Sequence, residues 1–594
     1  MTRSITESGA SEDAGDLERR LIDPRGGDVE DDAASPAQRS LLAIASSVLV
    51  EISLPKLLFA WIMSLVLPAV LLGLAPLAVT VWFASLSAHV KALTEIGAAL
   101  VLAASAAIGW LAWRPFLRIA ESNFWALNAL VVQPGYLLGA ELLRHLAERA
   151  FAGRMTNIRR ARLRAASSAA AGVIMCACAI VILVLVWPYS RWTGTVAELA
   201  LVHRLIVPMI ANAVVLVTAY LAAASLVWGF ADATMDQPAD FPAFDVAPAG
   251  RHFRIAHLSD LHTVGERYGF RIESGRRGPR GNARLCRALE RLAEIHATRP
   301  LDLILISGDM TDAGRATEWA EFLDAIARYP ALIARMIVLP GNHDLNIVDR
   351  ANPARLDLPF SPGKRLRQMR TLSAIAAVQG DRVHIANVDD KPMRSLNEAL
   401  APYRTPIANF AEHGGLRLAM GLGHIFGDQF PMIVLPGEPD GLGVAILNSN
   451  TESHFSFTNA LGVISAEQAR RLVAALDKFP DAAWIIALHH HLLEYPMPVA
   501  FSERVGTALV NGSWFVRKLK PFASRIVVMH GHRHTDWIGT CGSMKIISAP
   551  SPVMGADDAA STHFYIHTLV RDIDGRLCLI APERVEISRP MPSA

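Results

Sequence analysis

Four long stretches in the first 230 residues contain no Asp, Glu, Lys or Arg, and they constrain the fold more than any other feature. Each reaches or exceeds the roughly 18 to 20 residues that a helix needs to cross the hydrocarbon core of a bilayer. The overall composition agrees, because 52% of the residues are hydrophobic and only 19% are charged. Buried helices of a large soluble domain are the alternative interpretation. We predict four transmembrane helices, at residues 57–86, 96–113, 168–187 and 205–230, of which the second is the shortest.

The orientation of these helices is predicted from an arginine-rich loop. Residues 114–167, between the second and third helices, carry a cluster of arginines, and such loops stay on the cytoplasmic side of a membrane. The predicted membrane region spans 41–240, and both of its flanks are then cytoplasmic, which places the protein in the inner (plasma) membrane. The same arginines could instead contact anionic lipid headgroups. Residues 1–40 are rich in Asp, Glu, Ser and Gly without apolar periodicity, which predicts a disordered tail.

The charge balance and the cysteine content argue against several classes of binding partner and of stabilising site. The chain has 57 Lys and Arg against 55 Asp and Glu, and it has no basic stripe with interleaved aromatic residues, so no nucleic-acid partner is expected. Its 5 cysteines are scattered, which supports neither a disulfide framework nor a thiolate zinc site.

From about residue 250 the pattern changes to short aliphatic runs that alternate with helical segments and turns, which is typical of a layered α/β domain. We place this domain at 250–585. Ser465 followed by Gln468 predicts the start of one of its helices. Five of the apolar runs end on carboxylate, imidazole or Asn side chains. The residues at these ends are Asp260 and His262; Asp309 and Asp312; Asn342, His343 and Asp344; His489, His490 and His491; and His530, His532 and His534.

The carboxyl ends of strands are where open α/β sheets place their sites, so these side chains can converge on one crevice. Oxygen and nitrogen donors without Cys select divalent metals such as Mn, Fe or Zn. Seven or eight ligands suit two ions, which together polarise a phosphoryl group and generate a bridging hydroxide near neutral pH. Each motif alone means little, because Gly-Asp is usually a turn and a His run is often solvated. The whole set, in this order, predicts phosphoester hydrolysis.

At these same residues the sequence resembles the calcineurin-like metallophosphoesterases, and among them the class III cyclic nucleotide phosphodiesterases. The motifs Asp-x-His, Gly-Asp-x-x-Asp, Gly-Asn-His-Asp, a later His and Gly-His-x-His are all present, within roughly residues 252–560. The resemblance implies an α/β (α+β) fold, a four-layer β-sandwich flanked by helices, with a two-metal centre at the strand ends.

The resemblance also implies a role for each position. The first metal would take Asp260, His262, Asp309 and His534. The second would share Asp309 and add Asn342, His532 and one residue of the His triplet. His343 would protonate the leaving oxygen or stabilise phosphoryl charge, and Asp344 would orient His343 or its loop. The family usually has Pro two residues after the fourth-motif ligand, whereas Leu492 follows the triplet here; we favour His490 over His489.

Two segments outside the metal motifs have more than one possible role. Residues 347–440 are predicted to be an insertion that forms a wall or lid over the crevice, or else a dimer surface. Arg276, Arg277 and Arg280 follow the first metal motif and are candidates for binding a substrate phosphate, although a solvated loop is the ordinary alternative. His424 has no strand before it and is not expected in the site.

The sequence therefore predicts a membrane-anchored phosphoesterase with two divalent ions (Mn, Fe or Zn) that hydrolyses phosphodiester bonds, with cyclic nucleotides among the candidate substrates. The substrate would be a small phosphodiester or a lipid. One alternative is a hydrolase of a lipid-linked pyrophosphate or a phospholipid headgroup. Another is a membrane sensor or scaffold whose domain binds a ligand without turnover.

Overall fold

A computed structural model gives the fold, and the chain divides into two compact units. One comprises residues 53–235, and the described part of the other begins at Asp236. The described residues are 133–150, 157–191, 201–246, 249–266, 281–346, 348, 361–388, 392–413, 416–451, 460–496, 507, 509–554 and 561–587, with isolated positions between 70 and 107.

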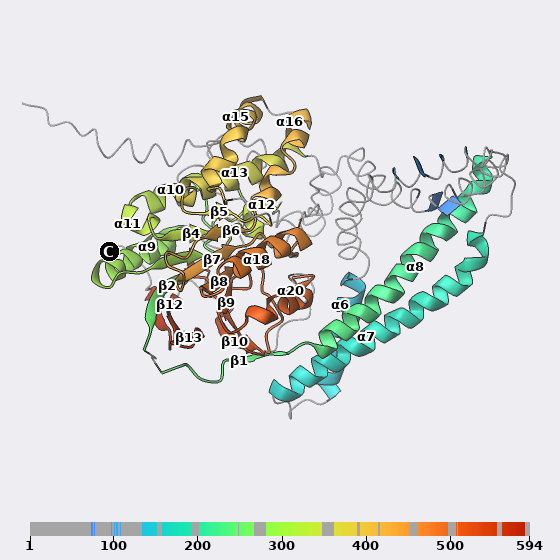
Figure 1. Ribbon diagram of the computed structural model, residues 1–594, viewed down its shortest axis with the longest axis horizontal. Coiled ribbons are helices and arrows are strands. Elements are labelled where there is room, and N and C mark those ends of the chain that lie inside the picture. The colour runs from blue at the N-terminus through green and yellow to red at the C-terminus, as the bar shows by residue number, and fades with distance from the viewer. Residues whose placement is uncertain are drawn as a thin grey trace, which may run out of the picture. The chain divides into compact units, whose positions relative to one another are not determined.

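The unit of residues 53–235 is helical. Its described elements are α6 (Gln133–Ala150), α7 (Asn157–Val186), the short 3-10 helix η4 (Trp187–Ser190) and α8 (Val202–Thr234). Helices α7 and α8 run antiparallel beside each other (Figure 1). They pack closely where Gly172 meets Gly229, because a Cβ atom on Gly172 would lie 3.0 Å from the Gly229 Cα. Small residues allow such close approach of two helices.

Helices α7 and α8 are long and apolar enough to cross a membrane, judged by length and composition. Large apolar side chains on both helices are exposed, among them Val184 at 62% and Phe230 at 68%. The spans expected at 168–187 and 205–230 fall on these helices. The spans expected at 57–86 and 96–113 lie outside the described residues, apart from isolated positions.

The second unit contains two β-sheets. The eight-stranded sheet has the order β1 (Pro238–Asp240), β10 (Trp537–Cys541), β11 (Met544–Ser548), β9 (Ile526–His530), β8 (Ala483–Ala487), β7 (Leu442–Ile446), β6 (Met432–Val434), β5 (His384–Ile385). The six-stranded sheet has the order β13 (Leu577–Leu579), β12 (Thr562–Arg571), β2 (Arg251–Leu258), β3 (Leu303–Ile306), β4 (Met336–Val338), with β14 (Glu583–Ile587) also paired to β12. Strands β2, β3 and β4 are mutually parallel, as are β7, β8 and β9.

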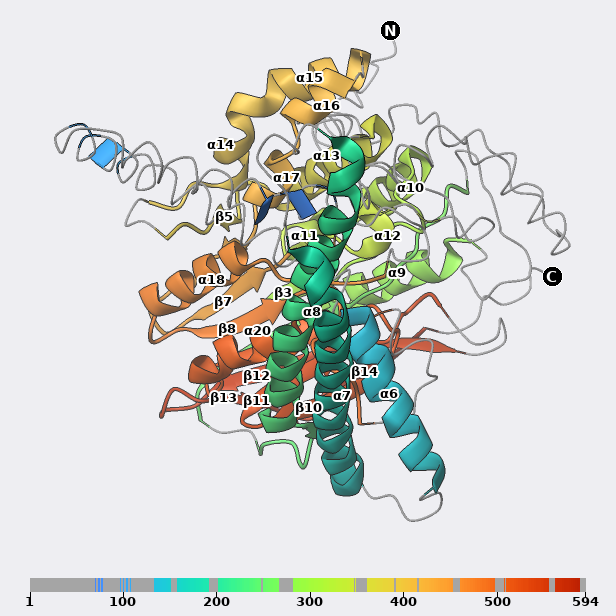
Figure 2. The ribbon, with the colours of Figure 1, turned by 90° about the vertical axis from the view of Figure 1, so that its right-hand side faces the viewer.

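Helices pack against both sheets, so the expected mixed sheets flanked by helices are present. They are α9 (Ala283–Thr298), α10 (Ala316–Ala327), α11 (Pro330–Ile333), α12 (Asn342–Leu345), α13 (Pro362–Gln379), α14 (Leu396–Leu400), α15 (Arg404–His413), α16 (Leu416–Gly421), α17 (Ile425–Asp428), α18 (Ala466–Lys478) and α20 (Gly512–Leu519), with the 3-10 helices η6 (Ala401–Tyr403) and η8 (Lys520–Phe522). Figure 2 shows α13, α15 and α16 gathered on one side of the strands and α18 beside β7.

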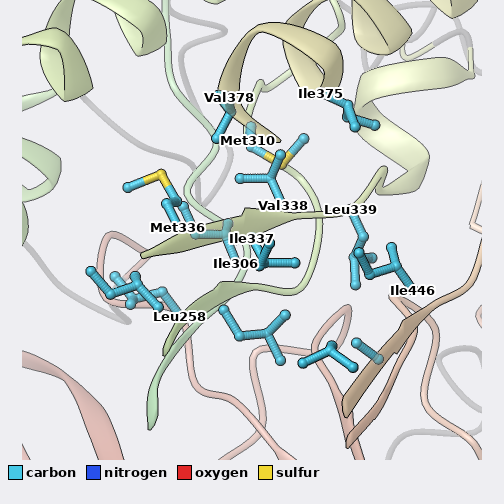
Figure 3. Close-up of a cluster of buried hydrophobic side chains, with 14 of the residues drawn as sticks. Leu258, Ile306, Met310, Met336, Ile337, Val338, Leu339, Ile375, Val378 and Ile446 are labelled. Atoms are coloured by element: carbon cyan, nitrogen blue, oxygen red, sulfur yellow. The ribbon is translucent and has the colours of Figure 1, made fainter. Parts of the chain in front are cut away.

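One apolar core joins the sheets and helices. Strand β3, with the sequence LILI, is buried on both faces, as expected for a parallel strand covered by helices. Figure 3 shows Val338 of β4 beside Val378 of α13. Ile306 of β3 is the register partner of Val338, and both belong to the same apolar core. This packing brings the carboxyl ends of the two parallel sets of strands to the same core.

The domain begins earlier than the expected residue 250. Strand β1 pairs antiparallel with β10, and the Trp537 indole Nε1 donates a hydrogen bond to Asp240 Oδ1 at 3.0 Å. Lys520 Nζ also lies 2.9 Å from Asp236 Oδ2. The start of this unit is therefore corrected to Asp236, two residues after the end of α8.

Part of the expected insertion, residues 347–440, belongs to the sheet and the helices of the domain. Its described residues supply α13 to α17, and also β5 and β6, which extend the eight-stranded sheet. Its role as a lid stays a prediction. At α18, the Ser465 hydroxyl accepts a hydrogen bond from Gln468 N, as expected, but the Gln468 side chain bonds to the backbone of Asn448 instead of completing a capping box.

Candidate metal centre

The backbone at the strand ends has an unusual conformation. Five residues other than Gly have positive φ: Asp260 (56°), His262 (43°), Asp309 (52°), His532 (78°) and His534 (50°). A positive φ is uncommon for residues other than Gly, and it marks places where the surrounding structure imposes the conformation. All five belong to the motifs identified in the sequence. The residues with a strained backbone are therefore the same residues whose side chains are candidate metal ligands.

Asp309 lies at the centre of these side chains and is 1% exposed. Its Oδ2 atom lies 3.2 Å from His489 Nε2 and 3.9 Å from His262 Nε2, while its Oδ1 accepts a hydrogen bond from His343 N at 2.8 Å. Burial alone raises the pKa of the Asp309 carboxyl, but the neighbouring imidazoles of His489, His343 and His262 outweigh it and hold that pKa well below its usual range. The carboxylate is therefore ionised and faces ligands on two sides.

Asp260, His262 and His534 form the group on one side of Asp309. His534 Nε2 lies 3.3 Å from Asp260 Oδ1 and 3.2 Å from His262 Nε2. The other Asp260 oxygen accepts a hydrogen bond from His532 N at 3.0 Å. Asp312 orients the His262 ring from the side away from the cluster, because His262 Nδ1 lies 3.2 Å from Asp312 Oδ1. A carboxylate partner behind an imidazole is the usual support of a metal-binding His.

Asn342, His489 and His532 form the group on the other side. Asn342 Oδ1 lies 3.0 Å from both His489 Nε2 and His532 Nδ1, and these two nitrogens are 3.2 Å apart. His489 Nδ1 donates to the Ser307 carbonyl at 2.8 Å, which directs Nε2 into the cluster. Burial alone lowers the pKa of His489, but Asp309 raises it to about 9.

The structure corrects the expected ligand of the triplet from His490 to His489. His490 Nδ1 lies 2.9 Å from the hydroxyl of Ser449, outside the cluster. Gly462 packs against the His490 ring, since a Cβ atom there would lie 2.6 Å from its Cγ. With His489 in the cluster, the position two residues later is His491 and not Leu492.

The donor set fits two divalent cations. Three overlapping groups of three residues each bring their ligand atoms within 4.8 Å of one another. Asp309 belongs to two of these groups, with His262 and His343 in one and with Asp260 and His489 in the other. Two pairs of imidazole nitrogens, His262 with His534 and His489 with His532, face each other at 3.2 Å, an arrangement that a shared cation satisfies better than a single proton can. None of the five cysteines takes part.

The comparisons with known proteins agree with this site. Residues 253–536 match the family described as calcineurin-like phosphoesterase. The chain carries a calcineurin-like metallophosphoesterase domain. The domain is accordingly that of a metal-dependent phosphoesterase. None of the curated proteins matches the chain.

Several solved structures resemble the chain at low identity. A putative 5'-nucleotidase from Staphylococcus aureus in complex with alpha-ketoglutarate is 12% identical, with a TM-score of 0.30 over 58% of this chain and 56% of that one. A dimetal phosphatase from Danio rerio is 14% identical, with a TM-score of 0.33 over 58% of this chain and 99% of that one. A Haemophilus influenzae NAD nucleotidase is 11% identical, with a TM-score of 0.28 over 57% and 56% of the two chains.

His343 stands at the rim of the metallophosphoesterase site. Its ring packs edge-on against that of His262, with centroids 4.6 Å apart, and it is partly exposed, as His532 and His534 are. Its Nδ1 donates to the Asp312 carbonyl at 2.6 Å. This hydrogen bond fixes the tautomer, so that Nε2 is the ring atom able to exchange a proton with a substrate.

Asp344 is completely buried and connects two of the motif loops. Its Oδ1 accepts from the backbone N and the hydroxyl of Thr311, at 2.9 and 2.7 Å, and its Oδ2 accepts from Gly341 N at 2.9 Å. Burial and the neighbouring Asp309 raise its pKa to about 6. These hydrogen bonds tie the loop of His343 to the loop of Thr311, and the orienting role of Asp344 stays a prediction.

The sequence analysis also raised four residues outside the metal motifs. Arg276, Arg277 and Arg280 lie outside the described residues. His424 is exposed and lies beside Tyr403, with ring centroids 6.1 Å apart. Sequence reasoning gave no role to Asp312 or Ser307, which orient His262 and His489. The Asp-x-x-Asp spacing could have suggested Asp312, but no sequence signal points to the backbone carbonyl of Ser307.

Proposed function

We propose that the metallophosphoesterase domain hydrolyses phosphodiester bonds at a two-metal centre. The observation that carries this proposal is the central position of Asp309, which lies between two groups of ligand atoms that come from different strand ends. A carboxylate in that position can bridge two ions, and a pair of ions is what an in-line displacement at phosphorus uses.

The residues divide into two sets. Asp260, His262, Asp309 and His534 would hold one cation, and Asp309, Asn342, His489 and His532 would hold the other. A pair of divalent cations polarises the phosphoryl oxygens and lowers the pKa of water. The chain's own residues supply the remaining functions, because their buried and hydrogen-bonded positions keep the ligands fixed before substrate binds.

His343 is the proton donor in this proposal. Its Nδ1 is held by the Asp312 carbonyl, so a protonated ring presents Nε2–H. Transfer of that proton to the leaving oxygen neutralises the alkoxide that forms as the P–O bond breaks. Asp344 contributes indirectly, by holding the loop that carries His343 against Thr311.

The preference for diesters, with cyclic nucleotides among them, is supported by the resemblance of the motif set to class III cyclic nucleotide phosphodiesterases. A phospholipid headgroup is a second candidate. Only residues 235–237 separate α8 from β1, so the phosphoesterase domain is joined to an apolar helix by a very short connection.

We also propose that α7 and α8 anchor the protein in a membrane, with the arginines at the start of α7 and the phosphoesterase domain on the cytoplasmic side.

The test uses the full chain purified in detergent. Hydrolysis of bis-p-nitrophenyl phosphate, a diester, and of p-nitrophenyl phosphate, a monoester, is measured with added Mn²⁺, Fe²⁺ or Zn²⁺. The variants are Asp309→Ala and His343→Ala, and His424→Ala is the matched control because His424 is an exposed imidazole outside the cluster. We expect metal-dependent diester turnover in the wild type and in the control.

The two site variants should fail in different ways. Asp309→Ala should reduce turnover to the background rate, since both cation sites lose a ligand. His343→Ala should lower kcat by about 10²–10⁴-fold, the usual contribution of a general acid. Turnover of the monoester alone would contradict the diester proposal. A wild type that binds two cations but hydrolyses neither compound, and that also leaves phospholipid vesicles intact, would contradict hydrolysis altogether.

A further inference from the structure

Glu494 connects two loops that carry candidate metal ligands, although it is not a ligand itself. Arg533 Nη1 lies 2.9 Å from one Glu494 oxygen and 3.1 Å from the other. His491 Nε2 lies 3.1 Å from Glu494 Oε1. The Arg533 and His491 side chains are only 5% and 1% exposed, and Glu494 is 17% exposed. One carboxylate therefore pairs with two largely buried basic side chains.

Each of these partners is next to a ligand. Arg533 stands between His532 and His534 in the Gly-His-x-His motif. The His491 ring stacks on the His532 ring, with centroids 6.0 Å apart and an interplanar angle of 12°. His491 also follows His489 by two residues. Glu494 thus reaches one ligand loop through a hydrogen bond and the other through an ion pair.

An aromatic ring completes the arrangement. The Arg533 guanidinium lies over the Tyr495 ring, 5.4 Å from its centroid, and the Tyr495 hydroxyl hydrogen-bonds to Ser548 Oγ at 2.8 Å. The ion pair is therefore held against the end of β11 as well as between the loops. A buried ion pair is weak evidence for stability, because desolvation offsets most of the attraction, but it does fix the geometry of the groups that it joins.

We propose that Glu494 is a positioning residue for His532, and with it for the cation site of Asn342, His489 and His532. The carboxylate holds His491 against the His532 ring and holds Arg533, the residue that follows His532 in the motif. Without it, the His532 imidazole loses its stacked support and its loop gains freedom. This inference rests on the two-metal centre of the proposed function, and it assigns a residue outside the ligand motifs.

The test measures cation binding by the full chain in detergent. Stepwise Mn²⁺ binding is followed by electron paramagnetic resonance for the wild type, Glu494→Gln and a matched control, Glu467→Gln, in which an exposed Glu that pairs with Arg470 and Arg471 is changed. We expect Glu494→Gln to weaken one of the two sites by about 10–100-fold, the usual cost of losing a group that orients a ligand. The other site, and both sites of the control, should keep wild-type affinity.

Two further variants separate positioning from a general loss of structure. Glu494→Asp keeps the carboxylate and should restore part of the affinity. The double variant Glu494→Gln/Arg533→Gln should bind no more weakly than the worse single variant, because both act through one contact. Wild-type affinity in Glu494→Gln, or equal weakening of both sites, overturns the proposal. If the wild type binds two Mn²⁺ ions without hydrolysing a phosphodiester, the proposed function fails, yet the same binding comparison still decides the role of Glu494.

Discussion

At the scale of single residues, the site depends on positions where a side chain would not fit. Gly308 has a φ of +104°, and a Cβ atom on it would lie 2.3 Å from His489 Nδ1 and 3.0 Å from Gly341 Cα. The Gly of the Gly-Asp motif therefore permits both the turn into Asp309 and the close approach of His489. The resulting contact between strand ends is what lets one carboxylate face two groups of ligands.

Replacing Gly308 with Ala should accordingly damage the site. The backbone strain alone should lower the free energy of unfolding by about 1–3 kcal/mol. His489 must also move, so cation affinity should fall. Thermal unfolding and Mn²⁺ titration of Gly308→Ala measure the two effects. Gly437→Ala is the control, because a Cβ atom there meets nothing within 4 Å. Wild-type Mn²⁺ affinity in Gly308→Ala would contradict this account of the contact.

The sequence predicted the members of the site better than their exact geometry. Asp260, Asp309 and His534 lie together as expected, because apolar strands ending in polar residues leave few other arrangements. The choice within the His triplet could not be made in the same way. His489, His490 and His491 are chemically identical, and their orientations depend on Ser307, Ser449 and Glu494, which come from other segments or lie beyond the triplet.

At the scale of secondary-structure elements, α10 begins with a buried acid. Glu318 is 3% exposed, and its Oε2 accepts hydrogen bonds from Ala313 N and Arg315 N, at 2.7 and 3.2 Å. These contacts close the loop that leads from Asp312 into the helix. Burial raises the pKa of Glu318 from 4.5 to about 8, although Arg315 opposes this rise.

This pKa makes a pH-dependent prediction. An acid whose pKa is higher in the folded state stabilises that state most below its unfolded pKa, and the contribution is lost as the pH rises toward the folded pKa. Glu318→Gln does not titrate and keeps an acceptor oxygen. Between about pH 5 and pH 8, the stability of the variant relative to wild type should therefore increase, by at most about 1.4 kcal/mol per pH unit. Thermal unfolding across this range tests it, and a pH-independent difference would contradict it.

Strands were predictable where they are long and apolar. Strands β2, β3, β8 and β9 follow runs that are apolar enough to be recognised, whereas β1 is the tripeptide Pro-Ala-Asp and has no strand pattern. It forms because β10 offers an unpaired edge and Trp537 donates to Asp240. Such a strand depends on its partner, so the sequence of the segment itself cannot indicate it.

At the scale of the whole molecule, α7 and α8 are long apolar helices with many large apolar side chains exposed. Exposed apolar surface of this extent is unfavourable in water and favourable in lipid. We expect the full chain to stay in the membrane fraction after an alkaline carbonate wash. A chain that begins at Asp236 should instead be released. Recovery of the intact protein in the carbonate supernatant would contradict a spanning role for these helices.

The short strand β1 also bears on how such a protein can evolve by recombination. Residues 236–240 follow directly on the last turn of α8, yet they complete the edge of the catalytic sheet. A crossover that joined this catalytic domain to another anchor at residue 250 would leave β10 with an open edge, a known starting point for aggregation. Functional fusions must therefore bring the segment from Asp236 with them, so a junction that keeps this edge covered lies upstream of Asp236.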